Sequence, residues 1–537
     1  MKASMRGNDV GGCRVGNAAV RLVLAALLLS VALLGRQIHA AIPDSERQVL
    51  ISIYNSMDGP NWSQSDGWMG SPGSECGWYG VHCNDGQTHI SGIQLNDINM
   101  GGQIPDLSGL SEVQVISFMQ NDYTSTGRIS GPIPNLSTMG SLKYFHVAGH
   151  MLSGSLPSAE SIPDSLTWLI VGRNSLTGSV PDYSARPNFW QLEAYSNQLS
   201  GTLPVAKKIS NMRVISLENN RFSGAIPTPF AGPSIISYDV RENSLSGQLP
   251  DFDSYPALRA FHAADNHLSG VIPSLSQLPR LQILNLRNNA LSGSIPSLDA
   301  NPLFNTFDVS INELTGSLPS FENNKFIQYI CAYNNQLSGE MPRSISHLEG
   351  LIIFDVHTNN LSGAISSVVG LAGLRQFDVS HNSLTGTPPR FSGNWSLEAV
   401  SLEGNKLSGQ IPPFEADLFS LGYYNASFNE LSGSFPDFSG PPLLKTVLIS
   451  HNQFDGPIPS LAALPLHSLV AGYNAFTGDP PDLPPNWAAG YSRLCPNSLN
   501  PVPSADWDAA TGIAPWYRDC ADGLIFRTSF EEYEDQR

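Results

Sequence analysis

A block of about 23 residues recurs along most of this chain, and no other feature restricts its fold as strongly. The block reads most clearly over residues 281–296, as L-x-x-L-x-L-x-x-N-x-L-S-G-x-I-P. Its glycine returns at intervals of 22 to 24 residues, at Gly154, Gly178, Gly201, Gly224, Gly247, Gly270, Gly293, Gly316, Gly339, Gly363, Gly386, Gly409, Gly433, Gly456 and Gly478. A fixed period in this range predicts a solenoid in which each block is one coil.

The apolar residues of one block predict a short strand. Side chains alternate across a strand, so Leu284 and Leu286 should point into the coil while Asn285 faces outward. Leu291 and Ile295 should close the same apolar column from the opposite wall. Each buried leucine or isoleucine contributes about 1.5–3 kcal/mol. Because a single coil has no partner for its apolar edges, stability must come from stacking neighbouring coils.

The recurring asparagine and glycine are predicted to be structural. A buried amide at the turn can satisfy backbone groups that would otherwise cost about 1–3 kcal/mol each. The glycine suits unusual backbone dihedrals, and the proline after it blocks a regular helix. The asparagines are Asn174, Asn197, Asn220, Asn243, Asn266, Asn289, Asn312, Asn335, Asn359, Asn382, Asn405, Asn429, Asn452 and Asn474.

With its L-S-G-x-I-P segment, the block resembles the plant-type leucine-rich repeat family over residues 90–481. The resemblance implies an α/β repeat solenoid, a right-handed leucine-rich repeat superhelix with a concave parallel β-sheet and disulfide-bonded caps. We expect about 17 rungs within residues 91–481. It also implies relatives among receptor ectodomains and inhibitors of cell-wall-degrading enzymes.

The segments flanking the repeats look like caps. In residues 41–90, the C-x-W-x-G-V-x-C spacing of residues 76–83 resembles the family's amino-terminal cap, and the resemblance implies a Cys76–Cys83 disulfide. Residues 482–522 are rich in proline and tryptophan, and we expect Cys495 and Cys520 to pair there as the C-terminal cap. Residues 523–537 form an acidic tail.

Residues 1–40 are typical of a secretory signal peptide, with basic residues before the apolar run 22–34. An uncleaved anchor helix is the alternative, although a run of this length is shorter than the roughly 20 residues that a bilayer span needs. Removing these residues changes the formal charge from −18 to −22, because five basic residues and one acidic residue leave. Such acidity disfavours nucleic acid and anionic membranes as partners. Cys13 would leave with the signal, so Cys331 is expected to be a free thiol.

The outward strand positions and their neighbours predict a binding surface on the concave face. Its middle is acidic and its last rungs are apolar, which suits a protein, peptide or glycan partner. No cofactor or metal is expected, and the oligomeric state stays open. The candidate partner-binding residues are Glu193, Tyr195, Asp239, Arg241, His262, Arg287, Asp308, Tyr329, Tyr333, Asp355, His357 and Asp378.

We therefore expect a secreted, non-enzymatic recognition protein, acting as an inhibitor, an adhesin or a receptor-like decoy. The alternatives are a structural cell-surface protein and a polysaccharide hydrolase built on Asp355 and Asp378, two carboxylates that could also hold calcium. An open sheet offers a hydrolase no enclosed pocket with oxyanion donors. In a eukaryotic secretory pathway, glycans are expected at the sequons Asn61, Asn135, Asn360, Asn394 and Asn425.

Overall fold

The computed structural model describes residues 42–121 and 127–520 of the chain. It divides into two compact units, Met1–Leu291 (unit 1) and Ser292–Arg537 (unit 2). The proposed signal peptide and acidic tail lie outside the described residues. In both units the chain forms a parallel-strand solenoid, with about 17 turns in all, as the repeat predicts. No helix among the described residues is long and apolar enough to cross a bilayer.

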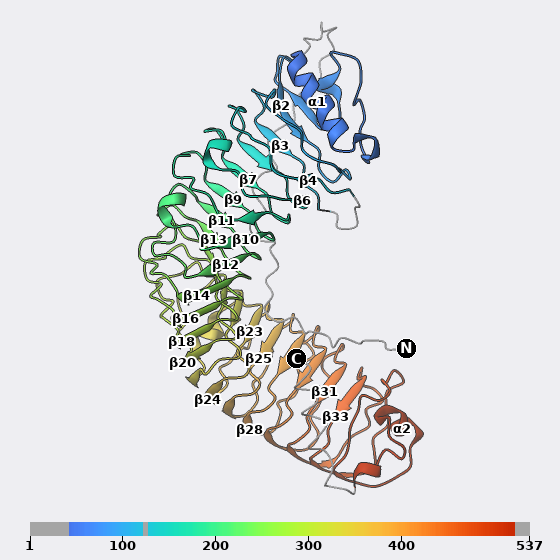
Figure 1. Cartoon of the computed structure of the whole chain (residues 1–537). Coiled ribbons are helices and arrows are strands. Elements are labelled where there is room, and N and C mark those ends of the chain that lie inside the picture. The colour runs from blue at the N-terminus through green and yellow to red at the C-terminus, as the bar shows by residue number, and fades with distance from the viewer. Residues whose placement is uncertain (1–41, 122–126, 521–537) are drawn as a thin grey trace. The chain divides into compact units, whose positions relative to one another are not determined.

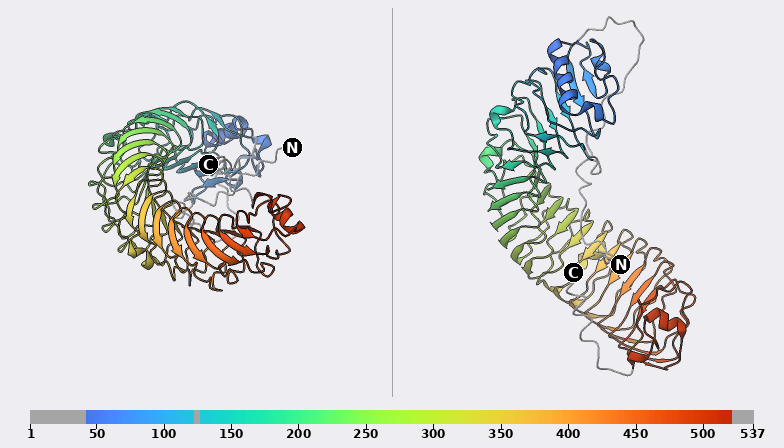
Figure 2. Two further views of the ribbon diagram at one scale, coloured as in Figure 1. Left: turned by 90° about the horizontal axis from the view of Figure 1, so that it is seen from below. Right: turned by 45° about the vertical axis from the view of Figure 1, so that its right-hand side comes forward.

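Unit 1 opens on helix α1 and continues as stacked coils. The strands of its main sheet succeed one another in rung order, as Figures 1 and 2 show. They pair in parallel except for β1, which is antiparallel to β2. The elements are α1 (Asp44–Ser56), β1 (Val81–Cys83), β2 (Ile90–Gln94), β3 (Val115–Ser117), β5 (Tyr144–His146), β7 (Trp168–Ile170), β9 (Gln191–Glu193), β11 (Val214–Ser216), β13 (Ser237–Asp239), β15 (Ala260–His262) and β17 (Ile283–Asn285).

A second set of short strands follows the turns of unit 1. These strands carry the Leu-Ser-Gly part of the repeat and also pair in parallel. They are β4 (Ser130–Gly131), β6 (Met151–Leu152), β8 (Thr177–Gly178), β10 (Gln198–Gly201), β12 (Arg221–Gly224), β14 (Ser244–Gln248), β16 (His267–Val271) and β18 (Ala290–Ser294). The short 3₁₀ helices of this unit are η1 (Gly59–Asn61), η2 (Glu75–Gly77), η3 (Ala159–Ser161) and η4 (Ala206–Ile209).

Unit 2 repeats the same plan and closes with helix α2 (Ala505–Thr511), which is followed by the short 3₁₀ helix η6 (Arg518–Cys520). One other 3₁₀ helix, η5 (Arg343–His347), lies between its rungs in the described part of the unit. Its main strands are β19 (Thr306–Asp308), β21 (Tyr329–Cys331), β23 (Ile353–Asp355), β25 (Gln376–Asp378), β27 (Ala399–Ser401), β29 (Tyr423–Asn425), β31 (Thr446–Leu448) and β33 (Ser468–Val470). The second sheet comprises β22 (Ser338–Glu340), β24 (Asn360–Ala364), β26 (Ser383–Gly386), β28 (Lys406–Gly409), β30 (Glu430–Gly433), β32 (Gln453–Pro457), β34 (Ala475–Gly478) and β35 (Ser498–Leu499), preceded by β20 (Glu313–Thr315).

The repeat residues take the roles that the sequence predicts. Leu284, Leu286 and Leu291 are fully buried, and Ile295 is nearly so. The amide nitrogen of Asn405 donates to the carbonyls of Val379, Leu402 and Glu403, while its oxygen accepts from the amide of Leu384. The recurring glycine has a positive φ, 75° at Gly293, where a Cβ would be strained. The structural interpretation of the asparagines is therefore confirmed.

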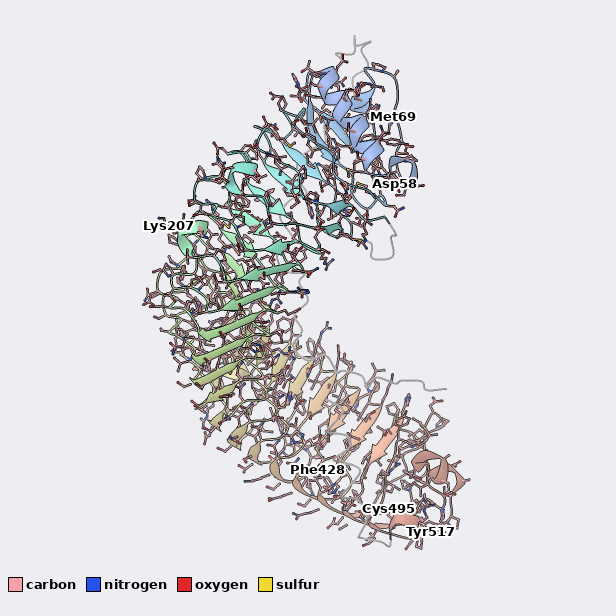
Figure 3. The ribbon with its side chains drawn as sticks, in the orientation of Figure 1. Asp58, Met69, Lys207, Phe428, Cys495 and Tyr517 are labelled. Atoms are coloured by element: carbon pink, nitrogen blue, oxygen red, sulfur yellow. A yellow bond between two sulfur atoms is a disulfide. The ribbon has the colours of Figure 1, made fainter. Side chains whose placement is uncertain are left out.

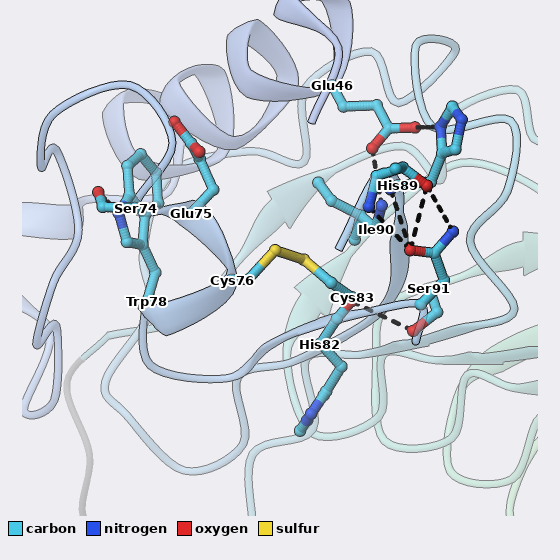
Figure 4. The surroundings of a disulfide bond; sticks show 12 residues. Glu46, Ser74, Glu75, Cys76, Trp78, His82, Cys83, His89, Ile90 and Ser91 are labelled. Carbon is cyan, nitrogen blue, oxygen red and sulfur yellow. Dashed lines mark hydrogen bonds and ion pairs between the residues drawn. A yellow bond between two sulfur atoms is a disulfide. The ribbon is translucent and has the colours of Figure 1, made fainter. Parts of the chain in front are cut away.

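Both expected cap disulfides are present. Cys76 is joined to Cys83, beside Glu75 and Trp78 as Figure 4 shows, and Cys495, labelled in Figure 3, is joined to Cys520. In the N-terminal cap, the buried Glu46 of α1 accepts a hydrogen bond from the amide of Ile90, at 2.7 Å, and so joins the helix to β2.

The expectation of a free thiol at Cys331 is wrong. The structure has Cys331 disulfide-bonded, and its side chain is fully buried at the end of β21. The sequence argument assigned Cys331 no partner after pairing the four cap cysteines. The strand position of Cys331 matches the sequence prediction, but its chemical state does not.

Candidate binding surface on the main sheet

The candidate site is the face of the main sheet that does not pack into the coils, hereafter the strand face. Its residues are the first and third of each main three-residue strand and those two positions further along. The middle residue of each such strand points inward, and Phe354 and Phe377, for example, are fully buried. Because the strands pair in register, a residue on one rung lies opposite its equivalent on the next, as Asp355 does with Asp378. Neighbouring strands lie about 4.8 Å apart, so such side chains interact directly.

In unit 1 the strand face carries a charged cluster of four side chains. The Arg241 guanidinium binds the Asp239 carboxylate through two nitrogens: Nε donates to Oδ1 at 2.9 Å and Nη2 donates to Oδ2 at 2.6 Å. His262 lies opposite Asp239 on the next strand, and burial lowers the pKa of its imidazole. On the other side, burial and then the charge of Asp239 raise the pKa of Glu218 to about 7. The positive charge of Arg241 thus binds one carboxylate, Asp239, and favours the charged form of a second, Glu218.

In unit 2 the strand face carries a second cluster around the facing pair Asp355 and Asp378. His357 Nδ1 lies 2.6 Å from Asp355 Oδ1, and its ring stacks on that of Tyr333 at 4.5 Å between centroids. The Ser380 hydroxyl donates to Asp378 Oδ1 at 2.6 Å, as does its amide at 3.0 Å. Burial and then the charge of Asp355 raise the pKa of Asp378 to about 6. The sequence analysis placed Asp355, His357 and Asp378 together, and the structure does so.

The remaining predicted residues lie on the strand face without joining these clusters. Glu193 accepts from Gln191 at 2.6 Å, the Arg173 guanidinium lies over the Tyr195 ring at 5.8 Å, and Arg287 lies 3.6 Å from Asp265. Tyr329 is half-buried on β21.

Three of the predicted aspartates on this surface are buried, and Asp239 is the least so, at 9% exposure. Asp308 is 1% exposed, and Asp355 is 2% exposed. Asp308 is held inward by the Ser310 hydroxyl, 2.5 Å from its Oδ1. A short carboxylate that folds back onto its own strand is easily covered by neighbouring rungs.

The sequence analysis missed an aromatic row on the strand face of unit 1. The Tyr144 and Trp168 rings meet edge to face at 5.3 Å, and Trp168 and Trp190 meet likewise at 5.5 Å. The Arg213 guanidinium lies 5.4 Å from the Trp190 ring centre. Tyr144 and Trp168 occupy the first strand position, where side chains share the face of the third position. Strand alternation alone could have identified them.

A second missed group is a ring stack in unit 2, formed by Phe428, His451 and Tyr473. Successive rings in this order lie 4.0 Å apart and nearly parallel. Phe428 is labelled in Figure 3. The three rings follow β29, β31 and β33 at the same repeat position, so comparing repeats would have revealed the stack.

The five sequons differ in accessibility. Asn61, Asn135 and Asn360 are exposed and stay candidates for modification. Asn394 is fully buried, and its amide nitrogen donates to the carbonyls of Val368 and Leu371. Asn425 is 3% exposed and donates to Glu403 at 2.6 Å. The structure therefore contradicts modification of Asn394 and Asn425 in the folded chain, because their amide nitrogens hold the coils together.

Comparison with known families matches two repeat-protein models. The model described as "Leucine rich repeat N-terminal domain" matches residues 43–84 and 466–500, and the model "Leucine Rich Repeat" matches residues 280–301 and 373–395. Among curated relatives from Arabidopsis thaliana, Pollen receptor-like kinase 5 is 26% identical over 126 residues, covering 22% of this chain and 17% of the relative. The inactive leucine-rich repeat receptor-like kinase At1g60630 is 31% identical over 121 residues, with the same two coverages. The chain thus spans less than a fifth of these relatives.

Solved structures match over far more of the chain. The plant peptide hormone receptor RGFR1 in complex with RGF2 has a TM-score of 0.62 and 25% identity, covering 79% of this chain and 80% of that one. A TDR receptor has a TM-score of 0.62 and 24% identity, covering 78% and 82%. The repeat block, the Cys76–Cys83 cap and these matches agree: the chain carries a leucine-rich repeat N-terminal domain followed by leucine-rich repeats, in the solenoid fold of leucine-rich repeat ectodomains.

Proposed function

We propose that this chain is an extracellular recognition protein that acts by binding a peptide or protein ligand on its strand face, without catalysing a reaction. One observation carries the proposal: charged and aromatic residues depart from the repeat on the strand face, while the second sheet keeps its glycine and the apolar residue two positions before it, most often as Leu-Ser-Gly or Leu-Thr-Gly. A purely structural solenoid needs only the repeat. The similarity to a receptor described as a complex with a peptide hormone supports this assignment.

The chemistry of the strand face favours a ligand with basic groups in unit 2. Asp308, Asp355 and Asp378 lie on main strands of this unit. Among the described residues, neither Asp355 nor Asp378 forms an ion pair with an arginine or a lysine. Charge complementarity of this kind contributes mainly to specificity and to the rate of association. A cationic peptide side chain would approach this pair through the half-buried Asp378, without competing with an internal arginine or lysine.

The test compares two triple variants with the same change in charge. The first is D308N/D355N/D378N on the strand face, and the second is E313Q/E340Q/E430Q on exposed second-sheet positions of the same unit. Each protein is used to select from a displayed peptide library, and the recovered peptides are then titrated against all three proteins. We expect the first variant to lose at least tenfold in affinity and the second to bind like wild type.

Two results would contradict the proposal. Equal loss in both triple variants would show only a nonspecific charge effect. Equal binding by all three proteins would place recognition elsewhere and favour the structural alternative. Thermal melting of each variant checks that a loss of binding is not a loss of fold, since asparagine can keep the serine-to-carboxylate hydrogen bonds at Asp308 and Asp378.

A further inference from the structure

Within unit 2, three potential metal ligands from two adjacent rungs converge on one point. Asp355, His357 and Asp378 each offer one ligand atom, and these atoms lie within 4.8 Å of one another. Asp355 and Asp378 are register partners on β23 and β25, and His357 follows Asp355 by two residues. The set mixes two carboxylates with one imidazole, so it is not merely an acidic patch.

The repeat itself shows that His357 is a departure. The next rung and the rung two before it have serine two residues after the aspartate, and in each the Ser380 or Ser310 hydroxyl donates to that carboxylate. The rung of Asp355 has His357 in this place, with Nδ1 on Asp355 Oδ1. A hydroxyl satisfies the carboxylate at the repeat position, whereas imidazole adds a nitrogen donor of the kind that transition metals prefer.

The charge balance of this cluster also differs from that of the cluster in unit 1. There, Arg241 binds Asp239 through two nitrogens. Among the described residues, no arginine or lysine nitrogen lies within 4.0 Å of a carboxylate oxygen of Asp355 or Asp378. Two carboxylates on facing positions about 4.8 Å apart repel each other when both are charged. A divalent cation between them would remove that repulsion.

We propose that Asp355, His357 and Asp378 form a site for a divalent transition metal, with Zn²⁺ as the ion that fits best. Zinc takes carboxylate oxygen and imidazole nitrogen at about 2.0–2.2 Å, and three protein ligands leave a fourth position open. Tetrahedral ligand atoms at that radius lie about 3.4 Å apart. A pair at the 4.8 Å limit must therefore close by about 1.4 Å. The 2.6 Å contact between His357 Nδ1 and Asp355 Oδ1 must open instead.

The surroundings hold the three ligands in place and leave the ion a way in. Two hydrogen bonds from Ser380 orient Asp378, and the stacked ring of Tyr333 fixes the plane of His357. Such partners around a metal ligand set its orientation and raise affinity. Asp355 is buried, whereas His357 and Asp378 are only half-buried, so the ion would enter from their side.

The experiment titrates the full chain with ZnCl₂ alone, followed by calorimetry, and repeats the titration with CoCl₂ followed by visible absorption. We expect one equivalent to bind to wild type, with affinity reduced at least tenfold in each of H357Q and D378N. The matched control is D308N, which removes the same charge from a rung that has Ser310 in place of the histidine. It should bind like wild type, and zinc should raise the melting temperature of wild type and D308N only.

Three outcomes would overturn the proposal: no binding, equal binding by all four proteins, or binding of CaCl₂ that H357Q leaves unchanged. The last would indicate a carboxylate calcium site without the imidazole. If H357Q loses its circular dichroism signal, it is replaced by H357N, whose amide can keep a hydrogen bond to Asp355 near the Nδ1 position without supplying an imidazole. The titration contains no peptide, so its failure leaves the proposed ligand-binding function standing, and the reverse also holds.

Discussion

Asn405 offers a direct measure of what each recurring asparagine contributes to the solenoid. It is 8% exposed, and its side chain makes four hydrogen bonds of 3.0–3.2 Å to backbone groups on two rungs. The carbonyls of Val379 and Leu402 also accept from Asn382 and Asn429, so each keeps one partner when Asn405 is removed. The amide of Leu384 loses the Asn405 oxygen, and this buried donor dominates the cost.

We expect Asn405→Ala to lower the free energy of unfolding by about 2–4 kcal/mol. An unsatisfied buried N–H costs about 1–3 kcal/mol, and each lost net hydrogen bond adds about 0.5–1.5 kcal/mol. Asn323→Ala is the matched control, because Asn323 is exposed and makes a single 3.4 Å bond to the Asp299 carbonyl. It should change stability by less than about 0.5 kcal/mol.

The assay combines urea unfolding with hydrogen exchange measured by mass spectrometry. Repeat proteins can open locally, so a global midpoint alone could miss a weakened rung. We expect the midpoint to fall in Asn405→Ala and exchange to accelerate in the peptide that contains Leu384. If Asn405→Ala matched Asn323→Ala in both measurements, the asparagines would not be the source of rung-to-rung cohesion, and the reasoning above would be refuted.

Three further predictions concern single residues elsewhere. Ile311 is β-branched yet has a φ of 54°, where Asn288 and Asn334 stand in adjacent rungs, so Ile311→Asn should raise stability by about 1 kcal/mol in urea unfolding. The pKa of Glu218 is raised to about 7, so the folded state holds this proton more tightly than the unfolded state does. The stability that this group contributes is therefore fully present below about pH 4.5 and is lost as the pH rises through 7. Glu218→Gln should make the melting temperature fall less steeply over this pH range. Arg47 forms an ion pair with the buried Glu75 of the cap. Arg47→Met should lower the stability measured by thermal unfolding by about 3–5 kcal/mol, because it leaves that carboxylate buried without a counter-charge. Replacing both residues with apolar ones should recover most of the loss.

The fold was predictable because its information is local and repeated. The alternation around Leu284 and Leu286 identifies the inward face, and the glycine interval fixes the coil length. The Cys76–Cys83 pairing followed from a cap motif eight residues long. Each of these signals recurs or lies within one coil, so no knowledge of distant contacts was needed.

The contacts that sequence reasoning missed join residues far apart or not repeated. Glu46 binds the amide of Ile90 across 44 positions, and Arg47 contacts Glu75 across 28. Neither follows a period. Strand alternation also does not predict whether Cys331 forms a disulfide or whether neighbouring side chains bury Asp308. Alternation tells which way a side chain points, and packing decides whether solvent reaches it.

The strand face shows how a repeat protein can separate stability from recognition. The aspartate and the serine two residues later satisfy each other within one rung, as in Asp308 with Ser310 and Asp378 with Ser380. Where arginine or histidine replaces that serine, after Asp239 or Asp355, the carboxylate keeps a partner and the rung keeps its fold. Such a substitution costs the solenoid little, because the asparagine and leucine positions that bind the coils together are untouched. It nevertheless places a new charge or a new metal ligand on the sheet, so the serine position of each rung is where this chain can acquire a binding function without losing stability.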